Sequence, residues 1–223
     1  MAWRDPRCSG VTMTIVLVLA AYLLGSLSGS LLLGRLRGVD IRTLGSGNAG
    51  GTNALRTQGA AFALATVVVD VGKGALAAWL AMRWLPPATN PAWAYACALA
   101  AVAGHVWPVF HGFRGGKGAA TLVGALAVVW PAGLLAVLPV WLLTLAWSGY
   151  VGLSTVLAGA SLVPMALLTA DDGDGWRLAF AAAAALLLLA THRANLSRLQ
   201  AGTEPRYERV RVLRKRPRSD GSH

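Results

Sequence analysis

The sequence predicts an all-α, multi-pass integral membrane protein with seven transmembrane helices. Of its 223 residues, 56% are hydrophobic and only 13% are charged, whereas soluble domains carry about 25% charged residues. Several apolar runs approach the roughly 20 residues that an α-helix needs to cross a bilayer. Alternating polar and apolar residues are scarce, which argues against a membrane β-barrel.

The charge distribution and the cysteines exclude several other classes of function. The formal net charge is +11, but the cations gather at the ends of apolar runs and near the C-terminus, which argues against nucleic acid as a partner. Cys8 and Cys97 are too few to indicate a disulfide framework or a metal site. No cluster of His, Cys, Asp and Glu has the spacing of metal ligands. The sequence therefore predicts neither a metal nor another cofactor.

The apolar runs, taken in order, predict the helices. We expect residues 1–12 to form an N-terminal arm, residues 13–204 the membrane domain and residues 205–223 a basic cytoplasmic tail. The first run is long and lacks a convincing small-residue cleavage site, so it is expected to be retained and not removed as a signal peptide. Either Met1 or Met13 could be the start of translation. Helices are expected over the runs at 13–33, 59–85, 92–109, 119–147, 150–168 and 176–191.

The run at 119–147 decides the topology, because it is long enough for one kinked pass or for two short ones. With two passes, the polar segments 35–56, 111–118 and 192–223 lie on one side and carry 15 of the 20 Lys and Arg residues. The opposite side then has an acidic loop at 171–174. Lys and Arg favour cytoplasmic connections. The sequence therefore predicts two passes, with the N-terminus outside and the C-terminus in the cytoplasm.

Two glycine-rich segments on the predicted cytoplasmic side have the composition of anion-binding loops. In residues 45–56, glycines alternate with small hydrogen-bonding side chains, and Arg56 closes the segment where the second apolar run begins. Residues 112–118 contain four glycines together with Arg114 and Lys117. Bare N–H groups beside fixed cations can cradle an anion, above all where a helix begins. The alternative is a pair of flexible linkers whose cations merely follow the membrane topology.

Further polar residues lie at the end of the last apolar run and inside the second one. His192 and Asn195 are three residues apart and would share a helix face. They would lie either in a pocket shared with the glycine-rich segments or at a basic helix end that contacts anionic headgroups. Asp70 and Lys73 are also three apart, and pairing would lower the cost of burying either charge, whether the pair is functional or structural. The cations at 206–218 are expected to attract anionic lipid.

Three of these segments resemble the signature motifs of a known family. GSGNAGGTNALRT, GHVWPVFHGFRGGKGAAT and HRANLSRLQAGTE look like the motifs of the bacterial membrane acyl-phosphate:glycerol-3-phosphate acyltransferases, the PlsY family, and the resemblance runs from about residue 20 to residue 204. It implies a seven-helix enzyme of the bacterial cytoplasmic membrane, with its active site facing the cytoplasm.

The resemblance also implies a reaction and its partners. A fatty acyl group would pass from acyl phosphate to the 1-hydroxyl of glycerol 3-phosphate, giving lysophosphatidic acid and phosphate, the first step of phospholipid synthesis. No cofactor would take part. The partners would be the two substrates, the lipid bilayer and the separate acyltransferase that produces the acyl phosphate.

By this resemblance, the expected catalytic residues are Arg56 and Lys117, which would clamp anionic groups, and His192 and Asn195, which would position substrate. The expected phosphate-binding residues are Ser46, Gly47, Asn48, Thr52, Asn53, His105, Gly115 and Gly116. For His105, a satisfied polar residue near the membrane interface is an equally good interpretation. Acyl phosphate is already activated, so no Ser or Cys nucleophile is required, and a substrate phosphate could take the hydroxyl proton.

Two observations qualify this assignment. Many family members carry Arg and Ser at positions where this chain has Gly149 and Gly152, so any substrate contact made there does not transfer. A transporter of a small phosphorylated anion would share the helices, cations and glycine-rich breaks. The polar clusters, however, gather on one side, whereas transport requires a path to the other.

Overall fold

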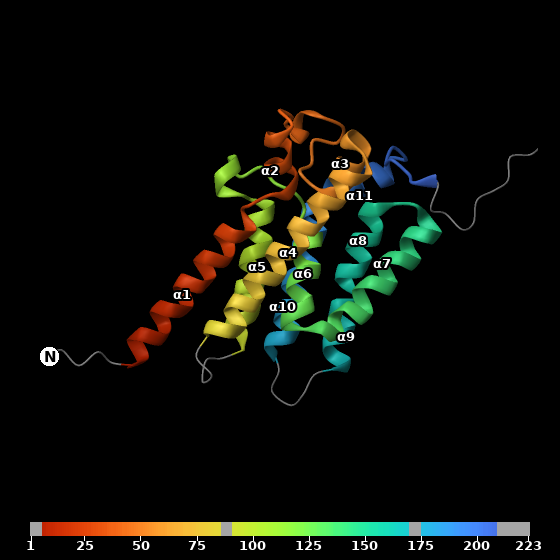
Figure 1. The fold of residues 1–223 in the computed structure, drawn as a ribbon. Coiled ribbons are helices and arrows are strands. Elements are labelled where there is room, and N and C mark those ends of the chain that lie inside the picture. The colour runs from red at the N-terminus through yellow and green to blue at the C-terminus, as the bar shows by residue number, and fades with distance from the viewer. Residues whose placement is uncertain (1–5, 86–90, 170–174, 209–223) are drawn as a thin grey trace, which may run out of the picture.

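The structure, a computed structural model, describes residues 6–85, 91–169 and 175–208, and in these ranges the regular structure is helical. The longer helices lie side by side along a common direction, and the short helices α2, α3 and α11 gather at one end of the bundle (Figure 1). The long apolar helices and the polar segments are thus separated in space, as the sequence predicts.

The first half of the chain differs from the prediction in its helix boundaries. Its elements are α1 (Pro6–Gly25), α2 (Gly29–Leu36), the 3-10 helix η1 (Ile41–Thr43), α3 (Gly51–Gln58) and α4 (Ala60–Trp84). The helix expected at 13–33 begins earlier and is divided into α1 and α2, which meet at an angle of 47°. The polar connection expected at 35–56 contains a helix of its own, α3.

The second half follows the predicted order more closely. Its elements are α5 (Ala92–Val106), η2 (Val109–His111), α6 (Ala119–Val129), η3 (Pro131–Gly133), α7 (Leu134–Ser148), α8 (Val151–Ala160), α9 (Leu162–Leu168), α10 (Gly175–Thr191) and α11 (Arg193–Gln200). The run at 119–147 forms two helices, as expected. The helix expected at 176–191 corresponds to α10, and a further helix, α11, follows it at a bend of 56°. The acidic loop predicted at 171–174 lies outside the described residues.

Several described helices have the length and composition of membrane spans. Four segments are long and apolar enough on their own to cross a membrane, and there are up to six such segments if α1–α2 and α10–α11 each count as one bent span. The apolar helix α6 is shorter. Large apolar side chains such as Leu64, Leu143 and Leu186 are more than 60% exposed, and a lipid environment accommodates such surfaces. The chain is an all-α integral membrane protein.

Glycines bring the backbones of neighbouring helices into close contact. A Cβ added to Gly74 in α4 would overlap the carbonyl of Thr121 in α6, and one added to Gly124 in α6 would overlap the carbonyl of Val71 in α4. Such close approach through small residues is typical of helix packing in membranes, where dispersion contacts replace the hydrophobic driving force. The α4–α6 pair is therefore held by backbone-to-backbone packing.

A buried polar network stabilises the break between α1 and α2. The Asp70 carboxylate accepts a hydrogen bond from the Gly29 backbone N–H at 3.0 Å and pairs with the Lys73 ammonium at 2.9 Å. Lys73 Nζ also donates to the Leu27 carbonyl at 2.9 Å and lies 2.8 Å from His105 Nδ1. The predicted Asp70–Lys73 pair is confirmed. It satisfies backbone groups that the helix break would otherwise leave unpaired in the membrane.

We expect Gly74→Ala to destabilise the protein by about 1–3 kcal/mol, because the added methyl group would force α4 away from α6. Gly72→Ala is the matched control, since a Cβ at Gly72 meets no atom within 4 Å and alanine favours the helix by about 1 kcal/mol. Thermal unfolding in detergent should lower the midpoint only for the first variant. Equal midpoints for the two variants would contradict the proposed α4–α6 contact.

Candidate active site

Asn53 holds the first glycine-rich loop in shape. Its Oδ1 accepts a hydrogen bond from the Ser46 backbone N–H at 2.9 Å. Its Nδ2 donates to the carbonyls of Ile41 at 3.1 Å and Leu44 at 2.9 Å. The side chain is 1% exposed, and both amide protons are used inside the loop. Asn53 was expected to donate to phosphate; the structure instead shows it bonded to the loop backbone.

The other predicted residues of this loop lie closer to its surface. Ser46 and Gly47 are exposed, whereas Asn48 and Thr52 are partly buried. Gly47 has a φ of 71°, a left-handed conformation that favours glycine. The helix α3 begins directly after the loop, and no side chain caps its N-terminus. The positive end of the α3 dipole and its first N–H groups are therefore available to an anion.

The second glycine-rich loop is closed by its own backbone. The N–H of Gly115 donates to the Val106 carbonyl at 3.1 Å, and that of Gly116 donates to the His105 carbonyl at 3.1 Å. These two N–H groups were expected to bind phosphate, but both are occupied. A Cβ at Gly116 would overlap the His105 imidazole, so close packing is the reason for glycine here. The Gly115 carbonyl accepts a bond from Ala49 N–H at 3.4 Å and links the two loops.

His105 lies beneath this second loop and belongs to the buried network around Asp70. His105 Nδ1 lies 2.8 Å from Lys73 Nζ and 3.4 Å from Asp70 Oδ1, so the ring is bonded to this pair whichever of its nitrogens carries the proton. The ring is 3% exposed, and its Nε2 faces the position of Gly116. One of the two interpretations expected a satisfied polar residue, and His105 is satisfied at Nδ1, with Nε2 directed at the loop.

Lys117, at the end of the second loop, joins that loop to α11. Its ammonium group donates to Asn195 Oδ1. Asn195 Nδ2 in turn donates to Glu204 Oε1 at 2.6 Å, and Arg198 Nε donates to Glu204 Oε2 at 2.7 Å. The Thr191 hydroxyl donates to the Lys117 carbonyl at 3.1 Å. The predicted residues Lys117 and Asn195 are therefore in direct contact.

The charges around Lys117 have a net positive sign. Burial is the main cause that lowers the pKa of the Lys117 ammonium, to about 8; Arg198 and Arg56 lower it further, and Glu204 opposes them. Arg56 is thus close enough to act on Lys117 electrostatically. Three cations surround one carboxylate, and an arriving anion would relieve their repulsion.

His192 lies at the bend between α10 and α11, and it is 5% exposed. Its Nδ1 is 2.8 Å from the Leu188 carbonyl. Because a carbonyl only accepts, Nδ1 carries the proton, and the lone pair on Nε2 is an acceptor. His192 and Asn195 were expected on one helix face. They instead lie on either side of the bend, where the Asn195 N–H donates to the His192 carbonyl at 2.9 Å.

Residues 203–208, which we call the C-terminal strap, fold back onto the turn between α7 and α8. The Arg206 guanidinium donates to the Ser148 carbonyl at 2.8 Å and lies 4.9 Å from the centre of the Tyr150 ring. The Tyr207 N–H donates to the Gly149 carbonyl at 2.9 Å. The strap was expected to belong mostly to a lipid-binding tail. The remainder of that tail, residues 209–223, lies outside the described residues.

The strap also reaches Arg56. The Arg56 guanidinium stacks 5.0 Å from the centre of the Tyr207 ring, and the Tyr207 hydroxyl donates to the Thr52 carbonyl at 3.5 Å. Neither Tyr207 nor Glu204 was predicted as a site residue. Glu204 lies inside the third motif-like segment, which was the only signal for it. Nothing in the sequence indicated that Tyr207 would pack on Arg56.

The structure gives a packing role to the two glycines of the α7–α8 turn. Gly149 has a φ of 76° and ends α7 in the left-handed conformation. A Cβ at Gly152 would approach Cβ of Asn195 to 2.6 Å. The absence of side chains at these positions therefore allows α11 to come close to α8. Arg206 brings a guanidinium to this turn from the strap.

Most of the predicted site residues lie on segments at one end of the bundle, namely α3 with the loop before it, the loop before α6, and the α10–α11 bend (Figure 1). His105 lies deeper, below the second loop. Within the described ranges, no group of three or more His, Cys, Asp and Glu side chains could hold a metal ion.

Comparison with known proteins identifies relatives over nearly the whole chain. Residues 15–202 match the family model described as glycerol-3-phosphate acyltransferase. The chain is 43% identical over 195 residues to the glycerol-3-phosphate acyltransferase of Synechococcus sp. (strain CC9902), covering 86% of this chain and 94% of that protein. It is 39% identical to the protein of the same name from Geotalea daltonii, covering 89% of this chain and all of the relative.

Two solved structures have the same fold. They are crystal structures of PlsY, an integral membrane glycerol 3-phosphate acyltransferase, in a glycerol 3-phosphate form and a lysophosphatidic acid form. The first superposes with a TM-score of 0.80 at 34% identity, covering 91% of this chain and 99% of that one. The second has a TM-score of 0.79 at the same identity, covering 90% and 98%. The chain belongs to the glycerol-3-phosphate acyltransferase family.

Proposed function

We propose that this protein transfers a fatty acyl group from acyl phosphate to the 1-hydroxyl of glycerol 3-phosphate. The family match supports an acyltransferase that acts on glycerol 3-phosphate. The two similar structures, named as the glycerol 3-phosphate and lysophosphatidic acid forms, supply an acceptor and its acylated product. The observation that carries the proposal here is the contact between Lys117 and Asn195, which joins two of the motif-like segments in a positively charged cluster.

Some of the site residues would contact the anionic groups of the substrates, and the others would hold the contacting residues and their loops in position. Arg56 and Lys117 supply fixed positive charge, and Asn195 orients the Lys117 ammonium. The side chains of Ser46, Asn48 and Thr52 would donate to a phosphate at the start of α3, whereas the Gly47 N–H already donates to the Leu44 carbonyl at 3.0 Å. Asn53, Gly115 and Gly116 shape the two loops, because their donors are bonded within the protein. His105 supports the second loop from below.

The chemistry requires positioning and charge stabilisation more than a protein nucleophile. The hydroxyl oxygen of glycerol 3-phosphate attacks the acyl carbonyl carbon, the bond from that carbon to the phosphate oxygen breaks, and phosphate leaves. The hydroxyl proton passes to the departing phosphate. Cations beside the carbonyl and the leaving phosphate stabilise the negative charge that develops there. The lone pair on His192 Nε2 would accept a hydrogen bond from the other hydroxyl group of glycerol 3-phosphate, which orients the molecule and leaves the 1-hydroxyl proton free to pass to the phosphate.

The proposed topology has seven spans and a cytoplasmic site. The four apolar segments, the two bent pairs and the shorter α6 would each cross the membrane. The end that carries α2, α3 and α11 would face the cytoplasm, because the Lys- and Arg-rich connections gather there. The membrane domain would extend through the strap to about residue 208, and the rest of the tail would contact anionic lipid. The protein would act in the bacterial cytoplasmic membrane, supplied by the enzyme that makes acyl phosphate.

Phosphate release from palmitoyl phosphate by the purified protein tests the reaction. We expect release only when glycerol 3-phosphate is present, with lysophosphatidic acid as the second product. Lys117→Ala and Arg56→Ala should each lose about 10²-fold or more in turnover. Arg83→Ala is the control, because Arg83 lies in the last turn of α4, away from the site. Uptake of labelled glycerol 3-phosphate into sealed vesicles without turnover would instead support the transporter.

The pKa of Lys117 near 8 predicts how activity depends on pH. The charged ammonium binds the anion, so kcat/KM for glycerol 3-phosphate should fall about tenfold per pH unit above 8 as Lys117 loses its proton. The substrate phosphate is already a dianion there, since its second pKa is about 6. Lys117→Arg keeps its charge and should show no fall between pH 8 and 10. A flat wild-type profile over that range would contradict the role of Lys117.

Two substitutions of His192 separate proton transfer from hydrogen bonding. Glutamine can retain an acceptor near the position of Nε2, but it is not a base. We expect His192→Gln to keep kcat within about tenfold of wild type and His192→Ala to lose more, with a raised KM. If both variants lose about 10²-fold or more in kcat, His192 is the general base and the leaving phosphate is not. Steady-state kinetics with both substrates varied makes this measurement.

A further inference from the structure

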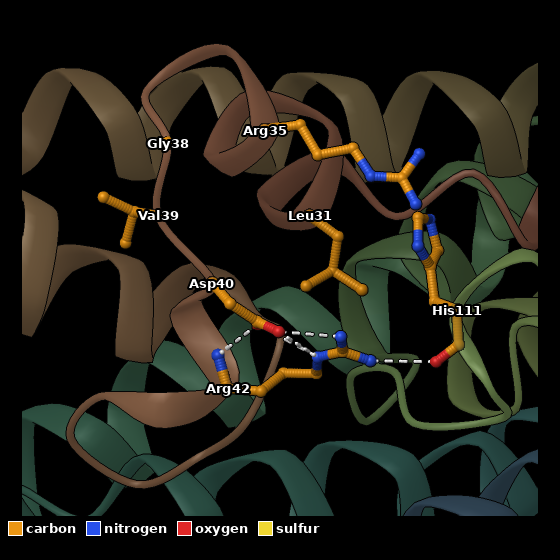
Figure 2. A pocket seen from close by; sticks show the side chains of 7 residues that line it. All are labelled: Leu31, Arg35, Gly38, Val39, Asp40, Arg42 and His111. Carbon is orange, nitrogen blue, oxygen red and sulfur yellow. Dashed lines mark hydrogen bonds and ion pairs between the residues drawn. The ribbon is translucent and has the colours of Figure 1, made fainter.

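A cavity of about 330 Å³, whose lining Figure 2 shows, borders the two glycine-rich loops. It is formed by α2, the connection that follows α2, η1 and η2. The lining residues are Leu31, Arg35, Gly38, Val39, Asp40, Arg42 and His111. None of the predicted catalytic residues lines it. A volume of this size is at the lower end of the range of small-ligand sites.

The one carboxylate of this cavity is already neutralised. Asp40 Oδ2 pairs with Arg42 Nη2 at 2.7 Å, and Asp40 Oδ1 accepts from Arg42 Nε at 3.0 Å and from its backbone N–H at 2.9 Å. These contacts lower the pKa of Asp40 to about 2, so it stays ionised and bonded. Arg42 Nη1 donates to the His111 carbonyl at 2.8 Å, which ties the two walls together. Asp40 and Arg42 therefore cancel in charge.

Two lining groups have unused hydrogen-bonding capacity. Arg35 is exposed to solvent, and its guanidinium makes no hydrogen bond or ion pair with any residue that the structure describes. His111 is 8% exposed, and its Nε2 is buried with no partner among the described residues. The side chains of Arg35 and His111 come together at one end of the cavity (Figure 2). A buried imidazole nitrogen without a partner is unfavourable, and a ligand between the two groups would bond to it while pairing with the exposed guanidinium.

We propose that this cavity binds a phosphate group through Arg35 and His111, outside the catalytic cluster. A guanidinium presents paired N–H donors that match phosphate oxygens, and the cavity carries the unbalanced positive charge of Arg35. The exposed apolar side chains of Leu36 and Phe110 lie next in sequence to the lining residues Arg35 and His111. The phosphate can therefore belong to a lipid headgroup or be free in solution. The site does not depend on the proposed reaction.

Magnetic resonance of the histidines tests this site directly. The protein, labelled with carbon-13 at histidine Cε1 and held in maltoside micelles free of phosphate, would be titrated with inorganic phosphate. A second sample would be titrated with short-chain phosphatidic acid, with the matching diacylglycerol as its uncharged control. The His111 signal would be assigned by its loss in His111→Phe. We expect a saturable shift of this signal with at least one of the two phosphate-bearing probes, and none with diacylglycerol.

Arginine variants complete the test. Arg35→Gln should weaken the binding measured at His111 by about tenfold or more. Arg37→Gln should leave it unchanged, because Arg37 stacks over Phe62 and does not line the cavity. A response to phosphatidic acid alone assigns the site to lipid headgroups, and a response to inorganic phosphate assigns it to the phosphate group itself. No saturable shift with either probe, or equal affinity in Arg35→Gln and wild type, would overturn the proposal.

Discussion

The hydrogen bond from Lys117 to Asn195 is the contact on which the site depends. It joins the loop before α6 to α11, and through Glu204 it extends to Arg198 and the start of the C-terminal strap. A partly buried ammonium group needs such partners, because burial lowers its pKa and favours the neutral form. The same partners hold the cation in a fixed position. The charge that an anionic substrate would meet is therefore built into the fold before the substrate arrives.

The membrane imposes a second constraint, which is met by the network around Asp70. The break between α1 and α2 leaves backbone groups that a bilayer cannot hydrate. Asp70 and Lys73 bond these groups, and both also lie against His105 Nδ1 beneath the second loop. A charged pair in α4 thus supports both the break in the first span and the base of the candidate site. The separation of apolar helices from polar loops follows from the same requirement.

The sequence predicted the parts that depend on local composition. Apolar runs indicated most of the helices, the spacing of Asp70 and Lys73 indicated their pair, and the motif-like segments indicated the family. It did not predict where hydrogen bonds would go. The N–H groups of Gly115 and Gly116 were expected to face an anion, yet they close the loop onto α5, and this depends on how the chain folds back. Tyr207 was likewise assigned to the tail. Its contact with Arg56 joins residues that are distant in sequence, and local composition does not indicate such a contact.

A double-mutant cycle between Lys117 and Asn195 measures how strongly the two residues depend on each other during the reaction. Lys117→Met, Asn195→Leu and the combined variant would be compared with wild type by kcat/KM for glycerol 3-phosphate. If the two residues act as one unit, the double variant should lose little more than either single variant, with a coupling energy of at least about 1.4 kcal/mol, or tenfold. Losses that add to within about 0.5 kcal/mol would contradict the account, because they would mean that Lys117 and Asn195 act independently.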